Sequence, residues 1–258
     1  LIDAGKYRYN YDSPWREHMT GSLSHSTLVV DHQSQNRRAQ NELWTADKPH
    51  DHVYDAEDRF VYFQRTYDAG YGKEAQIQVD HTRSVFFIDQ RFWVIFDRAT
   101  PHDASEHLYE SLLRVNANDA EARGDRIVTL RDKGPNLLVA AAPQAGQEVS
   151  VAKGQMDPVR RGWKKGGRDV VPHPMGAIGL RVEGPAQFAM LLYPVEPGKA
   201  IPGTTRIEFI ENTGGNQAMA VRVFVPDRKP LIVADQLGEG ALSAAGKRTE
   251  ARRAVWDE

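Results

Sequence analysis

Cysteine is absent from the 258 residues, so the sequence can form no disulfide and offers no thiolate to a metal. A strong net charge is missing as well. The 33 Lys and Arg residues nearly balance the 35 Asp and Glu residues, and the formal charge of −2 gives no reason to expect binding to nucleic acid or to an anionic membrane. No apolar run approaches the roughly 20 residues that a membrane-spanning helix needs.

Long amphipathic helix patterns are also lacking, and apolar residues recur with a period of two along most of the chain. This pattern predicts β-hairpins, whose turns fall at Asp89–Arg91, Asp132–Gly134, Glu183–Pro185 and Thr213–Asn216. The segment Ser243–Val255 is the one candidate for a short helix, or it is a frayed end. The sequence therefore predicts an all-β protein, an antiparallel β-sandwich of two stacked sheets, and leaves a closed barrel as the alternative.

The strands are interrupted between Pro143 and Pro174 by a loop rich in Gly, Lys and Arg. The interruption is too weak to divide the chain, so we expect a single domain over residues 1–258. Motifs of complete small hydrolases and nucleotide-binding enzymes are missing: there is no G-x-S-x-G, no H-E-x-x-H and no P-loop.

Histidine offers the most candidates for metal binding or for contacts with a ligand, since the chain has nine histidines. His50 and His52 in "KPHDHVYD" mimic a metal-binding pair, but two histidines in a polar loop are more often solvated. His25 differs because "SHSTLVV" places it where a strand pattern starts. A neutral imidazole at such a position can ligate a metal or bond to a sugar. Asp3 ends a short apolar run upstream, and either residue could equally be an ordinary capping or strand-end residue.

Several motifs occur together in a fixed order. "LIDAG" is followed by "SLSHSTLVVDHQSQ", then by "DHTRSVFFIDQRFWVIFDRA", by "HLYESLLRVN" and by "RGWKKGGRDVVPHP". This order resembles the C-terminal region of the heparinase II/III-like polysaccharide lyases, over about two-thirds of the chain from Leu1 to about Pro174. One departure is Ser26, which stands where the family usually has Asn.

The resemblance implies a larger parent protein. Members of this family join an N-terminal helical toroid to a β-sandwich and cleave uronic-acid-containing polysaccharides, of the heparin, heparan or alginate kind, by β-elimination. We therefore expect a bacterial, periplasmic or secreted parent whose toroid and first sandwich strand, with its His-x-His motif, precede Leu1. The family's proton-transfer groups lie on those missing parts. Hence we name no catalytic residue and expect the chain alone to be inactive.

The resemblance also assigns a structural zinc site. In relatives, the residues that match Asp3 and His25 hold the metal together with a histidine of the His-x-His strand. Zinc accepts nitrogen and carboxylate ligands in tetrahedral geometry. We therefore expect Asp3 and His25 to approach each other within about 8 Å, as two ligands of a site that this chain does not complete, since zinc–ligand bonds are about 2 Å long.

An acidic polysaccharide is the expected partner, and two features could contact it. The first is the segment "RRGWKKGGR", in which cations surround an aromatic ring; its candidate contacts are Arg160, Arg161, Trp163, Lys164 and Lys165. The second is His81 with Arg83, which share one face of a strand and either line the cleft or pair with Asp80 and Asp97.

Each of these two features also has an explanation that involves no ligand. The segment "RRGWKKGGR" could be a solvated loop, and His81 and Arg83 could be part of the interior. Tyr7, Tyr9 and Tyr11 alternate at strand spacing and are expected to form one face of a strand rather than to act as bases. For the whole chain, the alternative to a lyase domain is a non-catalytic carbohydrate-binding or structural β-sandwich module.

Overall fold

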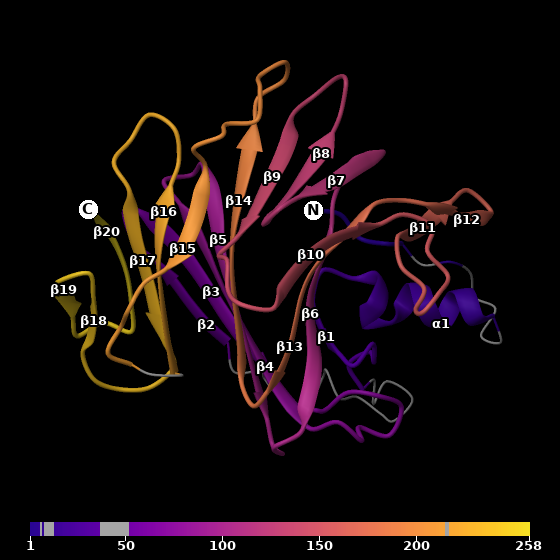
Figure 1. Cartoon of the computed structure of the whole chain (residues 1–258), viewed down its shortest axis with the longest axis horizontal. Coiled ribbons are helices and arrows are strands. Elements are labelled where there is room, and N and C mark those ends of the chain that lie inside the picture. Colours follow the sequence, from indigo (N-terminus) through magenta and orange to yellow (C-terminus); the bar gives the residue numbers. More distant parts are fainter. Residues whose placement is uncertain (6, 8–12, 37–51, 215–216) are drawn as a thin grey trace.

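The computed structural model describes residues 1–5, 7, 13–36, 52–214 and 217–258. In this part of the chain nearly all regular structure is β-strand, together with the short helix α1 (Pro14–Thr20) and the 3₁₀ turn η1 (Ser22–Ser24). Three sheets are stacked, as Figure 1 shows: a large one in the middle and a smaller one on each side. Every strand pair in the described residues is antiparallel.

The central sheet contains eight strands in the order β2-β3-β4-β5-β14-β9-β8-β7. In that order the strands span His52–Ala56, Phe60–Tyr67, Val79–Ile88, Phe92–Pro101, Ala186–Val195, Asn136–Ala141, Arg126–Leu130 and Asp119–Arg123.

Each flanking sheet contains four strands. One, β1-β6-β13-β10, is made of Leu28–Val30, Glu106–Arg114, Met175–Glu183 and Gln147–Ala152. The other, β15-β16-β17-β20, is made of Arg206–Phe209, Ala218–Phe224, Leu231–Gln236 and Arg253–Asp257. Two small hairpins complete the fold: β11 (Trp163–Gly166) with β12 (Asp169–Pro172), and β18 (Leu242–Ala244) with β19 (Lys247–Thr249).

Strand β5 shows why strands of the middle sheet have continuous apolar sequences. Val94 and Phe96 point into the core beneath the β15-β16-β17-β20 sheet, whereas Trp93 and Ile95 point into the core beneath the β1-β6-β13-β10 sheet. Both faces of the strand are therefore buried, and alternation between polar and apolar residues is not required. The predicted sandwich is confirmed, but it has three layers where two were expected.

Three of the four predicted hairpins are confirmed: β4–β5, β8–β9 and β15–β16 pair as neighbours. The strand orders are open, so the barrel alternative is not what the described residues form. The hairpin turning at Glu183–Pro185 is wrong. Its strands β13 and β14 follow each other in sequence, but β13 pairs with β6 and β10, while β14 pairs with β5 and β9. A tight Gly-Pro turn can return the chain within one sheet or carry it to the next, and local sequence does not distinguish the two.

The short helix predicted over Ser243–Val255 is also wrong. This tail forms the β18–β19 hairpin and the edge strand β20, which pairs with β17 from Leu231 to Asp235. Ala245 and Gly246 form the hairpin turn with φ of 47° and 74°. Residues with good helix propensity adopt strands here because pairing at the sheet edge and burial of Ala254 outweigh a preference of less than about 1 kcal/mol per residue.

Two expectations, the tyrosine strand face and the His50–His52 pair, fall partly on residues that the structure does not describe. Tyr9, Tyr11 and His50 lie outside the described residues. His52 begins β2, exposed, with its imidazole stacked on Phe63 at 6.0 Å. No helix in the described part of the chain is long and apolar enough to span a membrane.

Candidate functional site

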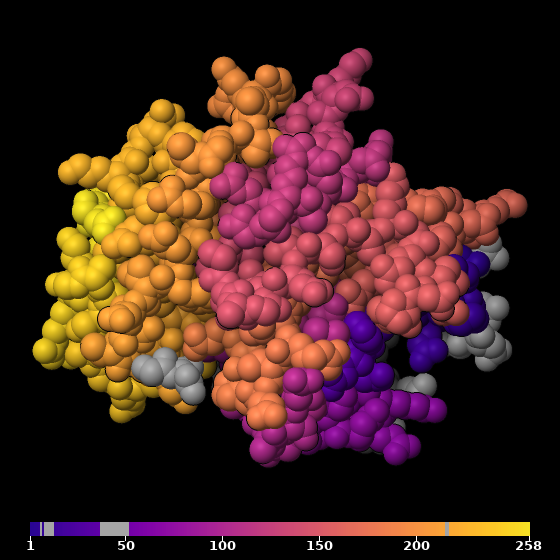
Figure 2. Space-filling view, viewed as in Figure 1, coloured from indigo at the N-terminus to yellow at the C-terminus, as the bar shows by residue number. Residues whose placement is uncertain are grey.

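The outer face of the β1-β6-β13-β10 sheet carries most of the residues that the sequence singled out. Val29, Leu112, Met175 and Ala177 form a small apolar cluster there, against Leu23 of η1. The hairpin β11–β12 lies on the same side. Its Trp163 ring meets the edge of Trp15 from α1, with ring centroids 5.0 Å apart. In Figure 2 the N-terminal residues, in indigo, lie against this orange-red segment at one end of the molecule.

Asp3 and His25 approach each other on this face, as predicted. The Asp3 Oδ2 atom lies 3.1 Å from His25 Nδ1, although the two residues are far apart in sequence. The other carboxylate oxygen, Oδ1, accepts a 2.7 Å hydrogen bond from the Gly5 amide. Gly5 has φ of 77°, a conformation that glycine adopts without strain, so the chain can turn back onto its own aspartate.

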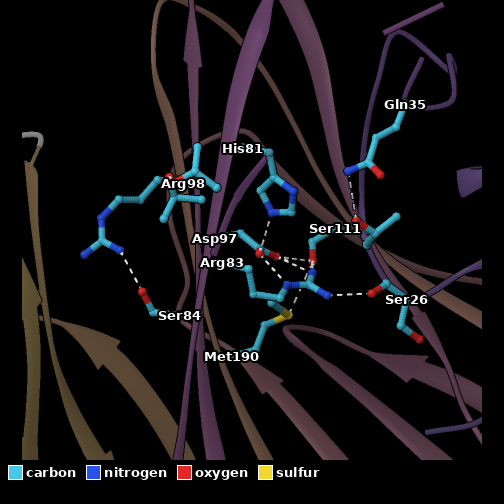
Figure 3. Close-up of polar contacts among 12 residues, drawn as sticks. Ser26, Gln35, His81, Arg83, Ser84, Asp97, Arg98, Ser111 and Met190 are labelled. Atoms are coloured by element: carbon cyan, nitrogen blue, oxygen red, sulfur yellow. Dashed lines mark hydrogen bonds and ion pairs between the residues drawn. The ribbon is translucent and has the colours of Figure 1, made fainter. Parts of the chain in front are cut away.

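Ser26, which follows His25, is held from two sheets. Its carbonyl oxygen accepts a 2.6 Å hydrogen bond from Arg83 Nη1 on β4, shown in Figure 3. Its hydroxyl accepts a 2.9 Å hydrogen bond from the backbone amide of Arg114 on β6. The histidine loop is therefore attached both to the central sheet and to its own sheet, and the orientation of His25 depends on both.

Asp97 anchors the arginine that makes the first of these contacts. The carboxylate is fully buried and binds Arg83 through Nε at 2.6 Å and Nη2 at 2.7 Å. His81 Nε2 lies 2.8 Å from the same carboxylate, and the Ser111 hydroxyl donates to it at 2.7 Å (Figure 3). Burial alone would raise the pKa of Asp97, but the charge of Arg83 and then the contact with His81 outweigh burial and hold the pKa far below its usual range.

For His81 and Arg83 the sequence left cleft lining and carboxylate pairing open, and the structure shows the pairing with Asp97. Asp80 instead lies 3.1 Å from His102. His81 is 4% exposed, so its imidazole belongs to the interior between the sheets. The strand alternation found the shared face correctly. It could not show that this face is covered by a second sheet.

Arg114, which the sequence did not single out, is the central cation of this face. Its side chain is fully buried and donates to the carbonyl oxygen of Trp163. Its Nε and Nη1 atoms have no partner among the described residues, and the same holds for the buried His18 Nε2, Ser24 Oγ and His173 Nδ1. Burial lowers the pKa of Arg114 to about 10, with Asp3 acting in the opposite direction.

Two histidines beside Arg114 are held neutral. Burial, followed by the charges of Arg160 and Arg114, lowers the pKa of His18 to about 4. Burial, followed by the charge of Lys164, lowers the pKa of His173 to about 4 as well. The site therefore combines uncharged imidazoles with an excess of positive charge, which suits a negatively charged group.

The five predicted contacts of the cationic segment divide into two kinds. Arg161 is buried and forms an ion pair with Glu110 of β6, and Arg160 lies over the Trp15 ring at 5.2 Å. Arg161 therefore fixes the segment to the sheet, and Arg160 fixes it to α1. The others differ: Trp163 and Lys164 are half-buried, and Lys165 is exposed. The segment is thus a packed hairpin rather than a loose loop, and only part of its charge is free to meet a ligand.

The donor set at Asp3 and His25, one carboxylate and one imidazole, fits two positions of a zinc site. No group of three or more His, Asp or Glu side chains that could hold a metal occurs in the described residues. Two ligands alone do not define a metal centre, so the predicted zinc remains a prediction.

Known proteins define the class. The family described as heparinase II/III-like, C-terminal, matches residues 1–187, and the chain belongs to this family. No curated protein matches the chain. Among solved structures, the heparan sulfate lyase HepC from Pedobacter heparinus superimposes with a TM-score of 0.62 at 17% identity. A heparinase III structure gives 0.62 at 12% identity, and the heparinase III gene product BT4657 gives 0.60 at 15%.

All three structures cover 100% of this chain, whereas the chain spans 34% of each of theirs. At these identities the likeness establishes the fold: this chain has the β-sandwich found in the C-terminal part of heparinase III. The relatives are polysaccharide lyases with a larger N-terminal domain.

Proposed function

We propose that this chain is the β-sandwich part of a bacterial lyase that cleaves uronic-acid-containing polysaccharides by β-elimination. The observation that carries the proposal is the family match over residues 1–187. The outer face supports it, because the half-buried Lys164 and the exposed Lys165 follow Trp163, whose carbonyl oxygen accepts a hydrogen bond from the buried Arg114. Aromatic rings cover sugar faces, and cations bind the carboxylates or sulfates of such glycans.

In this reaction a base removes the C5 proton of the uronic acid, a C4–C5 double bond forms, and the C4–oxygen bond breaks while an acid protonates the leaving oxygen. Negative charge grows on the carboxylate as the proton leaves, so positive groups beside it lower the barrier. The chain's share of this work is to bind and orient the acidic glycan. The base and the acid would come from the N-terminal domain of the parent protein.

Zinc is part of the proposal as a structural ion. Asp3 and His25 would supply two ligands, and a bound ion would fix the loop that Ser26 already attaches to two sheets. Because acidic polysaccharides of this kind are met outside the cytoplasm, a protein with this function would work in the periplasm or after secretion.

The test uses the parent protein with its N-terminal domain, incubated with heparin, heparan sulfate, hyaluronan and alginate. Ultraviolet absorbance of the unsaturated product should rise with at least one of them. Binding without any product by the intact protein would contradict the lyase function and favour a non-catalytic carbohydrate-binding module.

A further inference from the structure

His32 occupies a backbone position that normally excludes a bulky side chain. It follows β1 in a two-residue turn in which Asp31 has φ of 48° and His32 has φ of 59°. The Gln33 amide closes the turn with a 2.7 Å hydrogen bond to the Val30 carbonyl. This is a type I′ turn, whose second central position strongly favours glycine. The backbone alone does not mark a functional residue, because Gln90 holds the same position of the β4–β5 turn with φ of 55°. What distinguishes His32 is the set of contacts that its imidazole makes.

The imidazole of His32 is oriented by buried charges. Its Nδ1 atom lies 2.8 Å from Glu110 Oε2, and Glu110 is only 6% exposed. The Arg161 guanidinium, equally buried, forms an ion pair with the same carboxylate oxygen and has its Nη2 atom 3.1 Å from His32 Nδ1. A carboxylate held in place by an arginine thus fixes one edge of the imidazole ring.

The same contacts determine the tautomer. Nδ1 faces both an acceptor, Glu110, and a donor, Arg161, and the acceptor is closer and negatively charged. A charge-assisted N–H···O bond is the stronger of the two alternatives, so Nδ1 carries the proton. Nε2 is then left with its lone pair. The His32 side chain is 33% exposed, and Nε2 has no hydrogen-bond partner among the described residues.

We infer that His32 is a ligand-contacting residue that accepts a hydrogen bond at Nε2 from a hydroxyl group of an acidic sugar. The ligand class rests on the proposed function; the oriented acceptor rests on the geometry alone. Arg161 belongs to the cationic segment, and Glu110 and Arg114 lie on one face of β6, four residues apart. At about 3.3 Å per residue, Glu110 and Arg114 are about 13 Å apart along the strand. Arg114 is fully buried and bonded to the Trp163 carbonyl, so a glycan extended along this face from His32 would meet the less buried Lys164 and Lys165.

The first test needs no ligand. Nitrogen chemical shifts of the His32 ring in the chain should show a protonated Nδ1 and an unprotonated Nε2 at neutral pH. The opposite tautomer would overturn the inference, because Nε2 would then be a donor.

The second test measures binding of a uronic-acid oligosaccharide by titration calorimetry. His32→Gly should bind about tenfold more weakly, the effect expected for the loss of one hydrogen bond at a positioned acceptor. Its melting temperature should hold or rise, since glycine relieves the left-handed backbone. His32→Asn, which also tolerates that backbone, should weaken binding similarly. The matched control is His102→Asn, which removes another histidine that pairs with a carboxylate, Asp80; its affinity should equal that of the parent chain.

If the parent chain binds the oligosaccharide and both His32 variants bind equally well, the inference is overturned and the proposed function stands. If the unaltered chain itself binds no uronic-acid oligosaccharide, the inference is overturned, while the lyase function is decided by product formation in the intact protein. Binding by the chain and cleavage by the intact protein therefore separate the two failures.

Discussion

At the scale of single residues, the buried charges of the chain hold other side chains and the His25 loop in position. Asp97 is 0% exposed and joins Arg83, His81 and Ser111, and Arg83 in turn holds the loop that carries His25. Replacing a buried pair with apolar groups can be neutral, but removing one member leaves the other charge uncompensated. The network is therefore sensitive to loss of its single carboxylate.

Asp97→Asn should lower the free energy of unfolding by about 3–5 kcal/mol, because the partly buried Arg83 would lose the counter-charge that lies fully buried beside it. Urea denaturation at neutral pH measures the change. Asp80→Asn is the control, since the exposed Asp80–His102 pair should contribute no more than about 1 kcal/mol. Equal effects of the two substitutions would contradict the assignment of Asp97 as the anchor.

Acid should destabilise the protein through His18 and His173. Both have a pKa of about 4 when folded, below the ordinary value of 6.5, so the unfolded chain binds protons more readily between these limits. Their contribution to stability is complete above pH 6.5 and is lost as the pH falls toward 4. His107 has the opposite sign: burial lowers its pKa, but bonds to Asp31 and Asp103 outweigh burial and raise it.

The measurement is the urea midpoint of the unaltered chain and of the His18→Gln/His173→Gln double variant at pH 7 and pH 5. The unaltered chain should lose more stability between the two pH values than the double variant does. His107 is present in both, so its contribution cancels in the comparison. Identical slopes for parent and double variant would show that neither histidine is held neutral.

At the scale of elements, the hairpin β11–β12 shows what sequence can and cannot give. The sequence showed correctly that cations and an aromatic ring gather at Arg160–Arg168. It could not show that Arg161 forms an ion pair with Glu110 or that Arg160 lies over the Trp15 ring, because those partners are distant in sequence. Arg114 was missed for a related reason: within "HLYESLLRVN" it looks like an ordinary strand-end residue.

Lys164→Ser/Lys165→Ser should weaken binding of an acidic oligosaccharide and flatten the dependence of affinity on salt, because exposed charges are screened over about 8 Å at physiological ionic strength. Its melting temperature should stay close to that of the parent. Calorimetry at two salt concentrations measures both effects. Lys133→Ser/Lys199→Ser removes two exposed lysines from other loops and serves as the control; a change as large as that of the first pair would mean that only net charge matters.

Arg161→Ser tests whether the buried Arg161 has a structural role that Lys164 and Lys165 lack. This substitution leaves Glu110 buried without its arginine, so we expect a loss of about 3–5 kcal/mol in unfolding free energy. Denaturation by urea, followed beside the Lys164/Lys165 variant, gives the comparison. A folded and equally stable Arg161→Ser chain would contradict the ion pair with Glu110.

At the scale of the molecule, the fold class and three hairpins were predictable because short apolar or alternating runs separated by polar or Gly-containing turns are local signals. The Asp3–His25 contact was predictable only through the family resemblance, since two such residues occur together by chance in most chains. The third layer and the crossing at Glu183–Pro185 were not predictable. Both depend on which distant strand pairs with which, and the sequence does not encode this locally.

The chain by itself should not cleave polysaccharide, even where it binds one. The reason is that, under the proposed function, the groups that move protons would belong to the N-terminal domain of the parent protein. Incubation of the pure chain with heparin, heparan sulfate, hyaluronan and alginate should produce no unsaturated product by ultraviolet absorbance, while the intact protein under the same conditions serves as the positive control. Robust turnover by the chain alone would show that it carries its own base and acid.

The order of the strands along the chain also constrains how the chain can be made. The central sheet gains its last strand with β14, at residues 186–195, and by then all four strands of the β1-β6-β13-β10 sheet have been synthesised. Its opposite apolar face is covered by β15, β16, β17 and β20, which span residues 206–257. A ribosome adds about 5–20 residues per second, so this face stays uncovered for several seconds after β14 is made. Ribosome stalling or truncation between residues 195 and 257 would leave an aggregation-prone intermediate, and protection by chaperones would matter most in that interval.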